Sequence, residues 1–210
     1  MKNRDLILAY FAAVSHAVIV GLAFLFTKKA LIYASSMHVS AIRFTVSLLV
    51  LMFFTACKKV NLNFAGKDLR KAMILALFYP IAFFALQTLG LVYATSSEAG
   101  IIQPIVPIFT IILATRFLKE KTTTYQNLSI LLSVFGVLYI LIMKGSSLDF
   151  TKVAGIILLI LSNLSYAVNN ILTRDVVKQF TVVEISLIMN FTGFLFFNVV
   201  SLIEHLINGN

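Results

Sequence analysis

The sequence predicts an all-α polytopic membrane protein, and three observations carry that prediction. First, 60% of the residues are hydrophobic and 12% are charged, whereas a soluble domain is roughly 45–50% apolar and about 25% charged. Second, seven apolar stretches recur along the chain, each near the ~20 residues that a helix needs to cross the hydrocarbon core. Third, the connections between them are short and hold most of the charge. Lipid cannot satisfy exposed backbone N–H and C=O groups, so these stretches are predicted to be helices.

The seven predicted spans follow one another without room for a soluble domain. The alternating ten-residue pattern of membrane β-barrel strands is not present in the sequence. In chain order the spans are residues 6–27, 38–56, 72–93, 96–117, 126–143, 153–172 and 182–203.

The first two spans carry basic side chains. Lys28 lies at the end of the first span, where its long side chain is expected to reach the membrane interface. Arg43 lies inside the second span, where a charged group costs about 2.5–3.5 kcal/mol on insertion scales. Arg43 is therefore expected to face protein or water, where it is a candidate to bind an anionic group of a substrate. The alternative is that it reaches outward or pairs with a carboxylate.

The third span contains a proline and two polar side chains. Pro80 removes a backbone donor and is predicted to kink the helix. Tyr79 and Gln87 lie in the same span. Because polar groups at this depth need a partner across a helix interface or in a cavity, both are candidates to line a substrate path.

The fourth span begins with "TSSE" at residues 95–98. Thr95 or Ser96 near the cap and Glu98 in the first turn fit a capping box, and a carboxylate there also suits the helix dipole. A proton-titrating or cation-binding role for Glu98 at the outer mouth is the alternative, but the motif alone explains the residue.

Gln103, Pro104 and Pro107 interrupt the same span near its middle. Prolines are tolerated in a membrane helix when neighbouring helices, hydroxyl groups or water satisfy the freed carbonyls. One interpretation is a kinked packing helix in which Gln103 bonds to a neighbour. The other is a helix opened at mid-membrane to line a substrate path, with Pro80, Pro104 and Pro107 as kink or gating positions.

The sixth span contains an unusually polar stretch, "SNLSYAVNN". Asn163, Tyr166 and Asn170 fall at i, i+3 and i+7, so they share one face of a helix. That face serves either interhelical hydrogen bonding or cavity lining, and both uses require it to point inward.

Basic residues predict the orientation of the chain. If the N-terminus is cytoplasmic, 12 of the 17 Lys and Arg residues fall on the cytoplasmic side and 4 on the outer side, with Arg43 inside a span. This bias follows the positive-inside rule, and we expect a multi-pass protein of the bacterial cytoplasmic membrane. The cytoplasmic set is Lys2, Arg4, Lys58, Lys59, Lys67, Arg70, Lys71, Arg116, Lys119, Lys121, Arg174 and Lys178, and the outer set is Lys28, Lys29, Lys144 and Lys152.

The net charge of +9 is spread over separate short loops. An anionic lipid surface is the ordinary partner for such loops, so no nucleic acid is expected. Cys57 is the single cysteine and cannot form an internal disulfide. The sequence holds no Cys/His cluster, so neither a metal nor another cofactor is expected.

The stretch "YATSSEAGIIQPIVPIFTIILATRFLKEK" resembles the fourth-helix signature of drug/metabolite transporters of the EamA type. In that signature a start rich in small residues precedes a mid-helix proline, matched here by Pro107, and an aliphatic run ends in Leu-x-Glu, matched by Leu118 and Glu120. The stretch "VGLAFLFTKKAL" at 20–31 resembles the first helix of the family, and "AIRF" at 41–44 resembles the second. The family usually has tryptophan where this chain has Val20.

The resemblance covers essentially the whole chain and implies a ten-helix architecture of two inverted five-helix repeats. It also implies transport of small metabolites or drug-like solutes, as an exporter that works by secondary active alternating access. Residues 1–145 would form the first repeat, and 153–210 would form the first two helices of a second. On this basis we expect the chain to be a fragment or a C-terminally truncated member.

A weak internal repeat agrees with that division. A shift of 146 positions places Thr27 and Lys28 on Thr173 and Arg174. Five predicted helices separate the two copies, an odd number, so the second copy is inverted in the membrane. Inverted repeats with a site between the halves near the midplane are typical of secondary transporters.

Other functional classes fit the sequence less well. A retinal pump needs a lysine in its last helix, and 182–203 contains none. A signalling receptor usually has longer loops, and the three histidines are scattered without an HExxH motif, so no enzyme is expected. The remaining alternative is a non-transporting or partner-dependent membrane subunit that assembles as a homodimer.

Overall fold

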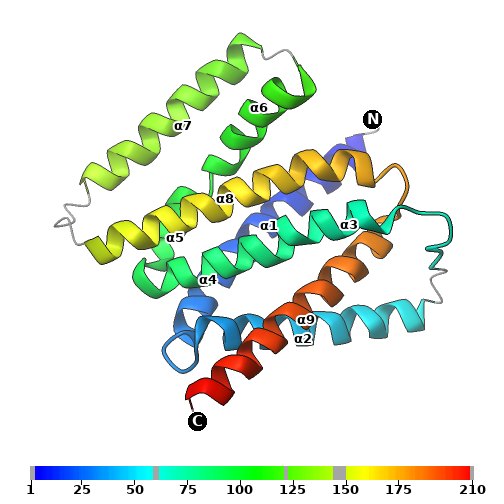
Figure 1. Cartoon of the computed structure of the whole chain (residues 1–210). Coiled ribbons are helices and arrows are strands. Elements are labelled where there is room, and N and C mark those ends of the chain that lie inside the picture. Colours follow the sequence, from blue (N-terminus) through cyan, green and yellow to red (C-terminus); the bar gives the residue numbers. More distant parts are fainter. Residues whose placement is uncertain (1–2, 59–61, 121–122, 144–149, 209–210) are drawn as a thin grey trace.

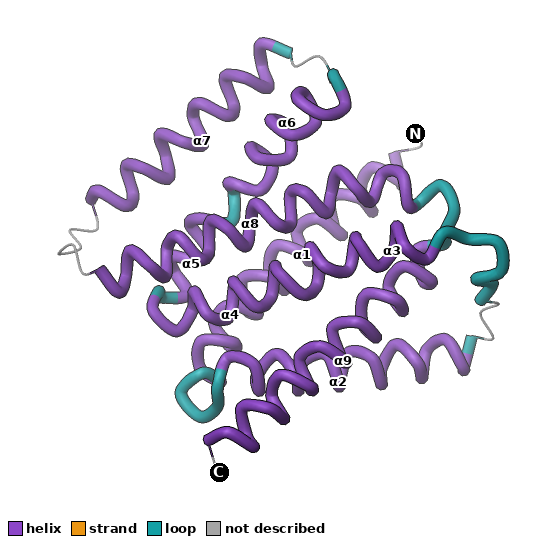
Figure 2. The backbone as a smooth tube through the Cα atoms, viewed as in Figure 1, coloured by secondary structure: helices purple, strands orange, loops and turns teal. Residues whose placement is uncertain are grey.

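The computed structural model describes residues 3–58, 62–120, 123–143 and 150–208 (Figure 1), and these ranges contain helices and loops but no strand (Figure 2). Lys2, Lys59, Lys121 and Lys144, which entered the orientation argument, lie outside the described residues. The helical segments are α1 (Asn3–Ala30), α2 (Ser36–Cys57), α3 (Leu69–Ala76), the π-helical segment η1 (Leu77–Ala82), α4 (Phe83–Tyr93), α5 (Ser96–Ile102), α6 (Ile105–Leu118), α7 (Thr124–Met143), α8 (Phe150–Val176) and α9 (Val182–Asn208).

Six segments in the described ranges are long and apolar enough to cross a membrane. They coincide with six of the seven predicted spans. The third is built from α3, η1 and α4, and the fourth from α5 and α6. The remaining predicted span, 126–143, is also helical and forms α7; that it crosses the membrane stays a prediction. The all-α polytopic class predicted from the sequence is confirmed.

Helix α8 lies in the middle of the molecule and packs against helices that end more than 30 residues before it begins. Its contacts are with α3, η1 and α4 on one side and with α5 and α6 on the other, while α9 packs against α2, α3 and η1. Figure 1 shows α8 running beside α4 and α3, with α2 and α9 on one flank and α6 and α7 on the other. The last two helices are thus embedded among the earlier ones.

The crossing of α4 and α8 is close because two glycines meet there. A methyl group on Gly155 would stand 2.9 Å from the Ala94 amide nitrogen and 3.0 Å from the Gly90 carbonyl oxygen, and one on Gly90 would stand 3.1 Å from the Gly155 carbonyl oxygen. Small residues allow membrane helices to approach in this way, where van der Waals packing replaces the hydrophobic effect. Leu159 and Leu91 pack beside the two glycines in a buried cluster.

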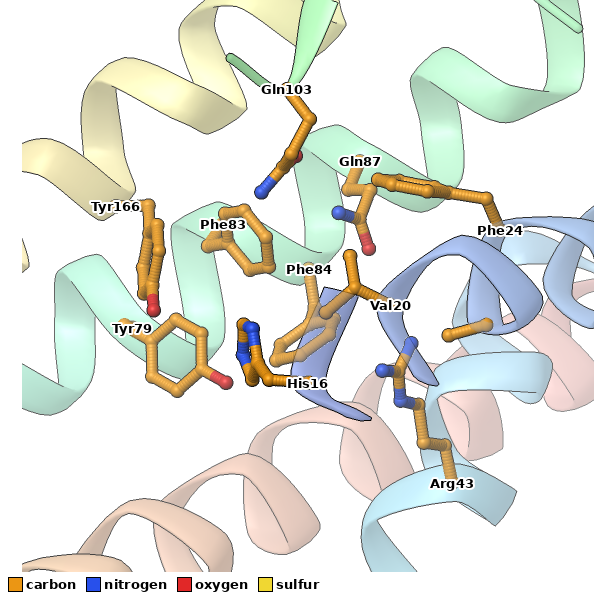
Figure 3. Close-up of a pocket in the computed structure, with 11 residues that line it drawn as sticks. His16, Val20, Phe24, Arg43, Tyr79, Phe83, Phe84, Gln87, Gln103 and Tyr166 are labelled. Atoms are coloured by element: carbon orange, nitrogen blue, oxygen red, sulfur yellow. The ribbon is translucent and has the colours of Figure 1, made fainter. Parts of the chain in front are cut away.

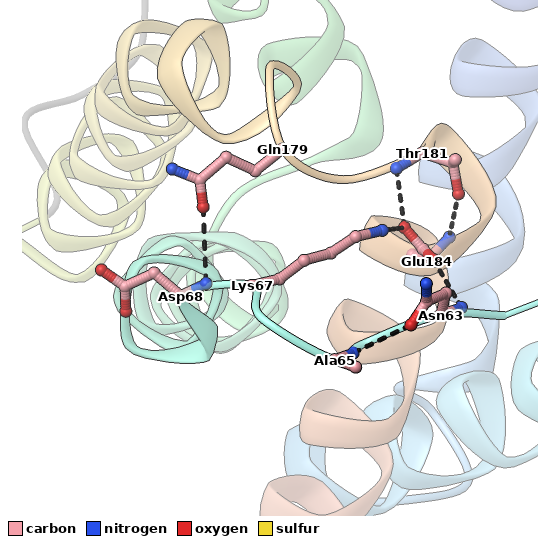
Figure 4. A network of polar contacts seen from close by, with 7 residues as sticks. All are labelled: Asn63, Ala65, Lys67, Asp68, Gln179, Thr181 and Glu184. Atoms are coloured by element: carbon pink, nitrogen blue, oxygen red, sulfur yellow. Dashed lines mark hydrogen bonds and ion pairs between the residues drawn. The ribbon is translucent and has the colours of Figure 1, made fainter.

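Polar contacts at the start of α9 fasten one end of the molecule (Figure 4). The carboxylate of Glu184, which is 1% exposed, accepts hydrogen bonds from Lys67 Nζ at 2.5 Å, the Asn63 amide at 2.9 Å and the Thr181 amide at 2.8 Å. The Glu184 amide in turn donates to Thr181 Oγ1 at 3.3 Å, which completes a capping box. The buried carboxylate therefore ties the α2–α3 connection to the start of α9.

The opposite end is fastened by contacts to helix termini. Lys28 Nζ donates to the carbonyls of Leu91 at 2.6 Å and Val92 at 3.2 Å, at the end of α4, where a cation also meets the negative pole of the helix dipole. The capping box predicted for Thr95 and Glu98 is present at the start of α5. Ser35 Oγ donates to Glu204 Oε2 at 2.7 Å and joins α2 to α9.

Candidate functional site

The third span is interrupted at the position predicted for Pro80. Tyr79 has φ −144° and ψ 113°, which is not helical. A residue before proline is pushed out of the α region by the pyrrolidine ring, so the change of backbone at Tyr79 follows directly from the sequence. The result is the segment η1 between two regular helices, with Pro80 buried in it.

The fourth span is broken rather than bent. Helix α5 ends at Ile102, α6 begins at Ile105, and Gln103 and Pro104 lie between them. Pro104 has no N–H to donate to the preceding turn. Pro107 falls in the first turn of α6, where a missing donor is easily tolerated. The break therefore falls at Gln103 and Pro104, one turn before Pro107.

The break leaves a carbonyl that helix α8 satisfies. The Val106 amide donates to the Gln103 carbonyl at 3.1 Å, three residues back, instead of to the carbonyl of Ile102. Asn163 Nδ2 on α8 donates to that Ile102 carbonyl at 3.0 Å. A carbonyl in the membrane interior without a donor is costly, so Asn163 supplies the partner that the interrupted helix lacks.

Two further α8 side chains bond to the third span near its own interruption. Ser165 Oγ donates to the Phe78 carbonyl at 2.9 Å, and Ser162 Oγ donates to the Phe83 carbonyl at 3.1 Å. Ser162, Asn163 and Ser165 are all buried. Helix α8 thus holds both interrupted spans through their backbones.

A cavity lies beside the two interruptions (Figure 3). Its volume is about 100 Å³, which is room for a few water molecules or for one small group of a solute. Side chains from α1, α2, η1, α4 and α8 and from the α5–α6 break converge on it. The lining residues are His16, Val20, Ala23, Phe24, Arg43, Tyr79, Phe83, Phe84, Gln87, Gln103 and Tyr166.

Arg43 brings a charge to this cavity. It lies seven residues into α2, about 10 Å along the helix axis at about 1.5 Å per residue. Its guanidinium carbon stands 4.4 Å from the centre of the Phe84 ring, a distance at which a cation is attracted to the ring face. Among the described residues Arg43 has no carboxylate within ion-pair distance.

The other polar groups of the cavity are also left without partners. Within the described ranges, no hydrogen bond joins the side chain of His16, Tyr79, Gln87, Gln103 or Tyr166 to another residue. Gln87 is only 6% exposed, and Figure 3 shows the amide groups of Gln87 and Gln103 directed toward the space between the rings. Buried polar groups are normally hydrogen-bonded, so these side chains are available to a bound solute or to water.

Aromatic rings form one wall of the cavity. The ring centre of Tyr166 lies 5.3 Å from that of Tyr79 and 5.1 Å from that of Phe83, and Tyr79 and Phe84 are 5.3 Å apart. These spacings are typical of tilted and edge-on aromatic contacts. The wall joins α8 to η1 and α4 and presents apolar surface opposite the polar groups.

A second cavity, with a volume of about 270 Å³, adjoins the first. Arg43, Tyr79 and Phe84 line both cavities, so these three side chains stand between them. The second cavity is otherwise lined by Phe44, Ser47, Pro80, Ser186, Met189 and Asn190.

Five of the seven residues proposed from the sequence as substrate-binding or cavity-lining meet at the first cavity, namely Arg43, Tyr79, Gln87, Gln103 and Tyr166. Asn163 and Asn170 are not among the residues that line this cavity. Asn163 bonds to the α5–α6 break, and Asn170 Nδ2 contacts Thr110 Oγ1 at 3.5 Å. Both therefore take the interhelical role that the sequence left open.

Sequence reasoning missed the contribution of α1 and of the phenylalanines. His16 entered the sequence analysis only as one of three scattered histidines, yet an ionisable residue inside an apolar span was a sufficient signal. Phe24, Phe83 and Phe84 are three of 19 phenylalanines, and no pattern in the sequence distinguishes them from the others. In the described residues no three His, Cys, Asp or Glu side chains are grouped so that they can hold a metal ion.

Comparison with known proteins places this architecture in a family. Residues 7–142 match the EamA-like transporter family. The chain belongs to this family. The match includes the spans that contribute His16, Arg43, Gln87 and Gln103 to the cavity.

The chain is also similar to several curated transporters. It is 41% identical over 197 residues to the Bacillus subtilis protein named Uncharacterized transporter YcxC, a match that covers 94% of this chain and 63% of the relative. It is 25% identical over 167 residues to an uncharacterized transporter of Archaeoglobus fulgidus, covering 79% of this chain and 57% of the relative. The chain thus spans less than two thirds of the length of these relatives.

Replacement of Asn163 tests its assignment to the helix break. Asn163→Ala is expected to lower the free energy of unfolding by about 1 kcal/mol, because the Ile102 carbonyl loses its donor. Asn170→Ala, whose contact is longer and joins two side chains, is the matched control and is expected to have a smaller effect. Thermal unfolding of both variants in detergent measures the difference, and equal melting temperatures would remove the proposed role of Asn163.

Proposed function

We propose that this EamA-like protein moves a small metabolite or drug-like solute across the bacterial cytoplasmic membrane, as a secondary active exporter. The observation that carries the proposal is the cavity between α1, α2, α4 and α8. It combines a deep cation, unpaired amide, imidazole and phenol groups, and an aromatic wall. In a packed core, so many unpaired polar groups at membrane depth would be costly. In a solute path, the same groups can bond to the solute or to water.

The proposed mechanism is alternating access between two inverted halves, residues 1–145 and 153–210. Tyr166 on α8 contributes to the cavity from the second half, and the remaining lining side chains come from the first. Arg43, Tyr79 and Phe84 separate the first cavity from the second. Displacement of these three side chains would let a solute pass from one cavity to the other, and the interrupted spans supply the backbone positions at which such movement is easiest.

The proposed orientation places the N-terminus and the end of α2 in the cytoplasm. Cys57 is exposed at the end of α2, and Tyr33 is 82% exposed in the α1–α2 connection at the opposite end. In intact cells an impermeant maleimide is expected to leave Cys57 unlabelled until the membrane is permeabilised. The control is Cys57→Ser combined with Tyr33→Cys, which is expected to react from outside. Reversed labelling of the two positions would overturn the orientation.

Transport itself is tested by replacing a polar cavity residue without changing its size. Gln103→Leu is expected to reduce solute flux in proteoliposomes at least tenfold, because the amide is directed into the cavity. Thr115→Val is the control, since Thr115 lies exposed on α6 and bonds only to the Ile111 carbonyl of its own helix. The measurement is counterflow across a panel of anionic, neutral and cationic metabolites. Absence of flux for every solute, or equal flux in both variants, would contradict the proposal.

A further inference from the structure

We propose that the cavity selects an organic carboxylate with an aromatic body, and that it excludes organic cations. The inference rests on the proposed function, since it names the class of solute for the same site. Four features of the site lead to it: its charge, the geometry around Arg43, the aromatic wall and the lack of acidic side chains in the lining.

The charge of the site is positive and uncompensated. Arg43 is the only lysine or arginine among the lining residues, and the lining contains neither Asp nor Glu. A guanidinium stays protonated at any physiological pH. An isolated charge at this depth is unfavourable unless it is paired, so a bound anion would stabilise the site while a bound cation would add to its charge.

The surroundings of Arg43 favour a planar anion. The guanidinium carbon stands 4.4 Å from the centre of the Phe84 ring, and among the described residues its N–H groups have no hydrogen-bond partner, so they remain available as donors. These N–H groups form a rigid fork, and it matches the two oxygens of a carboxylate in a bidentate arrangement. Because Arg43 lines both cavities, a carboxylate held there would sit at the junction through which a solute has to pass.

The remainder of the cavity suits an aromatic body. The rings of Tyr79, Phe83 and Tyr166 lie within 5.1–5.3 Å of one another and offer surfaces for an additional ring. In Figure 3 the amide of Gln103 lies above these rings and the amide of Gln87 lies to the right of Phe83, and both can bond to a hydroxyl or keto substituent.

An amino group on the solute would find no carboxylate in the lining. Its ammonium would have only neutral acceptors, the tyrosine hydroxyls and the glutamine carbonyl oxygens, and would be repelled by Arg43. The cavity is therefore expected to prefer an aromatic acid to the corresponding amino acid, and the amino acid to the corresponding amine.

Three probes that share a phenyl ring on a two-carbon chain test this order. They are 3-phenylpropionate, phenylalanine and 2-phenylethylamine, titrated calorimetrically against the purified full chain in detergent. We expect 3-phenylpropionate to bind at least tenfold more tightly than phenylalanine, and 2-phenylethylamine to bind most weakly. Equal affinities, or tightest binding of the amine, would overturn the proposal.

Substitution of Arg43 tests the same point from the side of the protein. Arg43→Gln is expected to weaken 3-phenylpropionate binding at least tenfold, and Arg43→Lys, which keeps the charge but not the fork, is expected to weaken it less. Arg70→Gln is the matched control, because Arg70 is exposed on α3 away from the cavity. Unchanged binding in Arg43→Gln would overturn the proposal. If that variant does not fold, the order of the three probe affinities, measured on the unaltered chain, decides whether the proposal holds.

Measuring binding and flux separately distinguishes a failure of this inference from a failure of the proposed function. Flux of neutral or cationic solutes without binding of 3-phenylpropionate would retain transport and overturn the carboxylate site. Binding of 3-phenylpropionate that depends on Arg43, without flux of any solute, would support the site and contradict transport.

Discussion

The need to satisfy every backbone carbonyl inside a membrane governs this structure. Two spans are interrupted by proline, and lipid offers no hydrogen bond to the groups that an interruption frees. Helix α8 supplies the missing donor for the Ile102 carbonyl through Asn163, and its Ser162 and Ser165 hydroxyls add hydrogen bonds to the carbonyls of Phe83 and Phe78 beside the other interruption. The glycine contact between α4 and α8 brings the backbones close enough for such short side chains to reach. Without α8, the Ile102 carbonyl at the break in the fourth span would have no donor.

The interruptions allow a polar site to exist at membrane depth. A continuous helix would direct its side chains at regular 100° steps and fill the space between spans. Here η1 and the α5–α6 break turn Tyr79 and Gln103 toward Arg43 and Gln87. The contacts at the two ends, Glu184 with Lys67 and Lys28 with the end of α4, join the same helices away from the cavity. Membership of the EamA-like transporter family is consistent with a site of this kind.

The sequence was sufficient to predict what depends on composition and local pattern. Hydropathy located six spans, the TSSE motif located the α5 cap, and mid-span polar residues pointed to five of the cavity side chains. The sequence did not predict features that depend on which helices pack against one another. Asn163 and Tyr166 share a helical face, yet one bonds to a broken helix while the other lines the cavity. The pairing of Lys67 with Glu184 joins residues 117 positions apart, and no local pattern indicates it.

The reactivity of a cysteine at position 103 tests most directly whether the break opens onto a water-filled path. Gln103→Cys in a Cys57→Ser background would be treated with a charged, membrane-impermeant methanethiosulfonate reagent. Ile112→Cys is the reference, because Ile112 is 53% exposed on α6, where lipid is expected to cover it. Rapid reaction at position 103 and none at 112 is the predicted result. A cysteine at 103 that is as unreactive as the one at 112 would mean that the break is sealed by packing and that no solute reaches it.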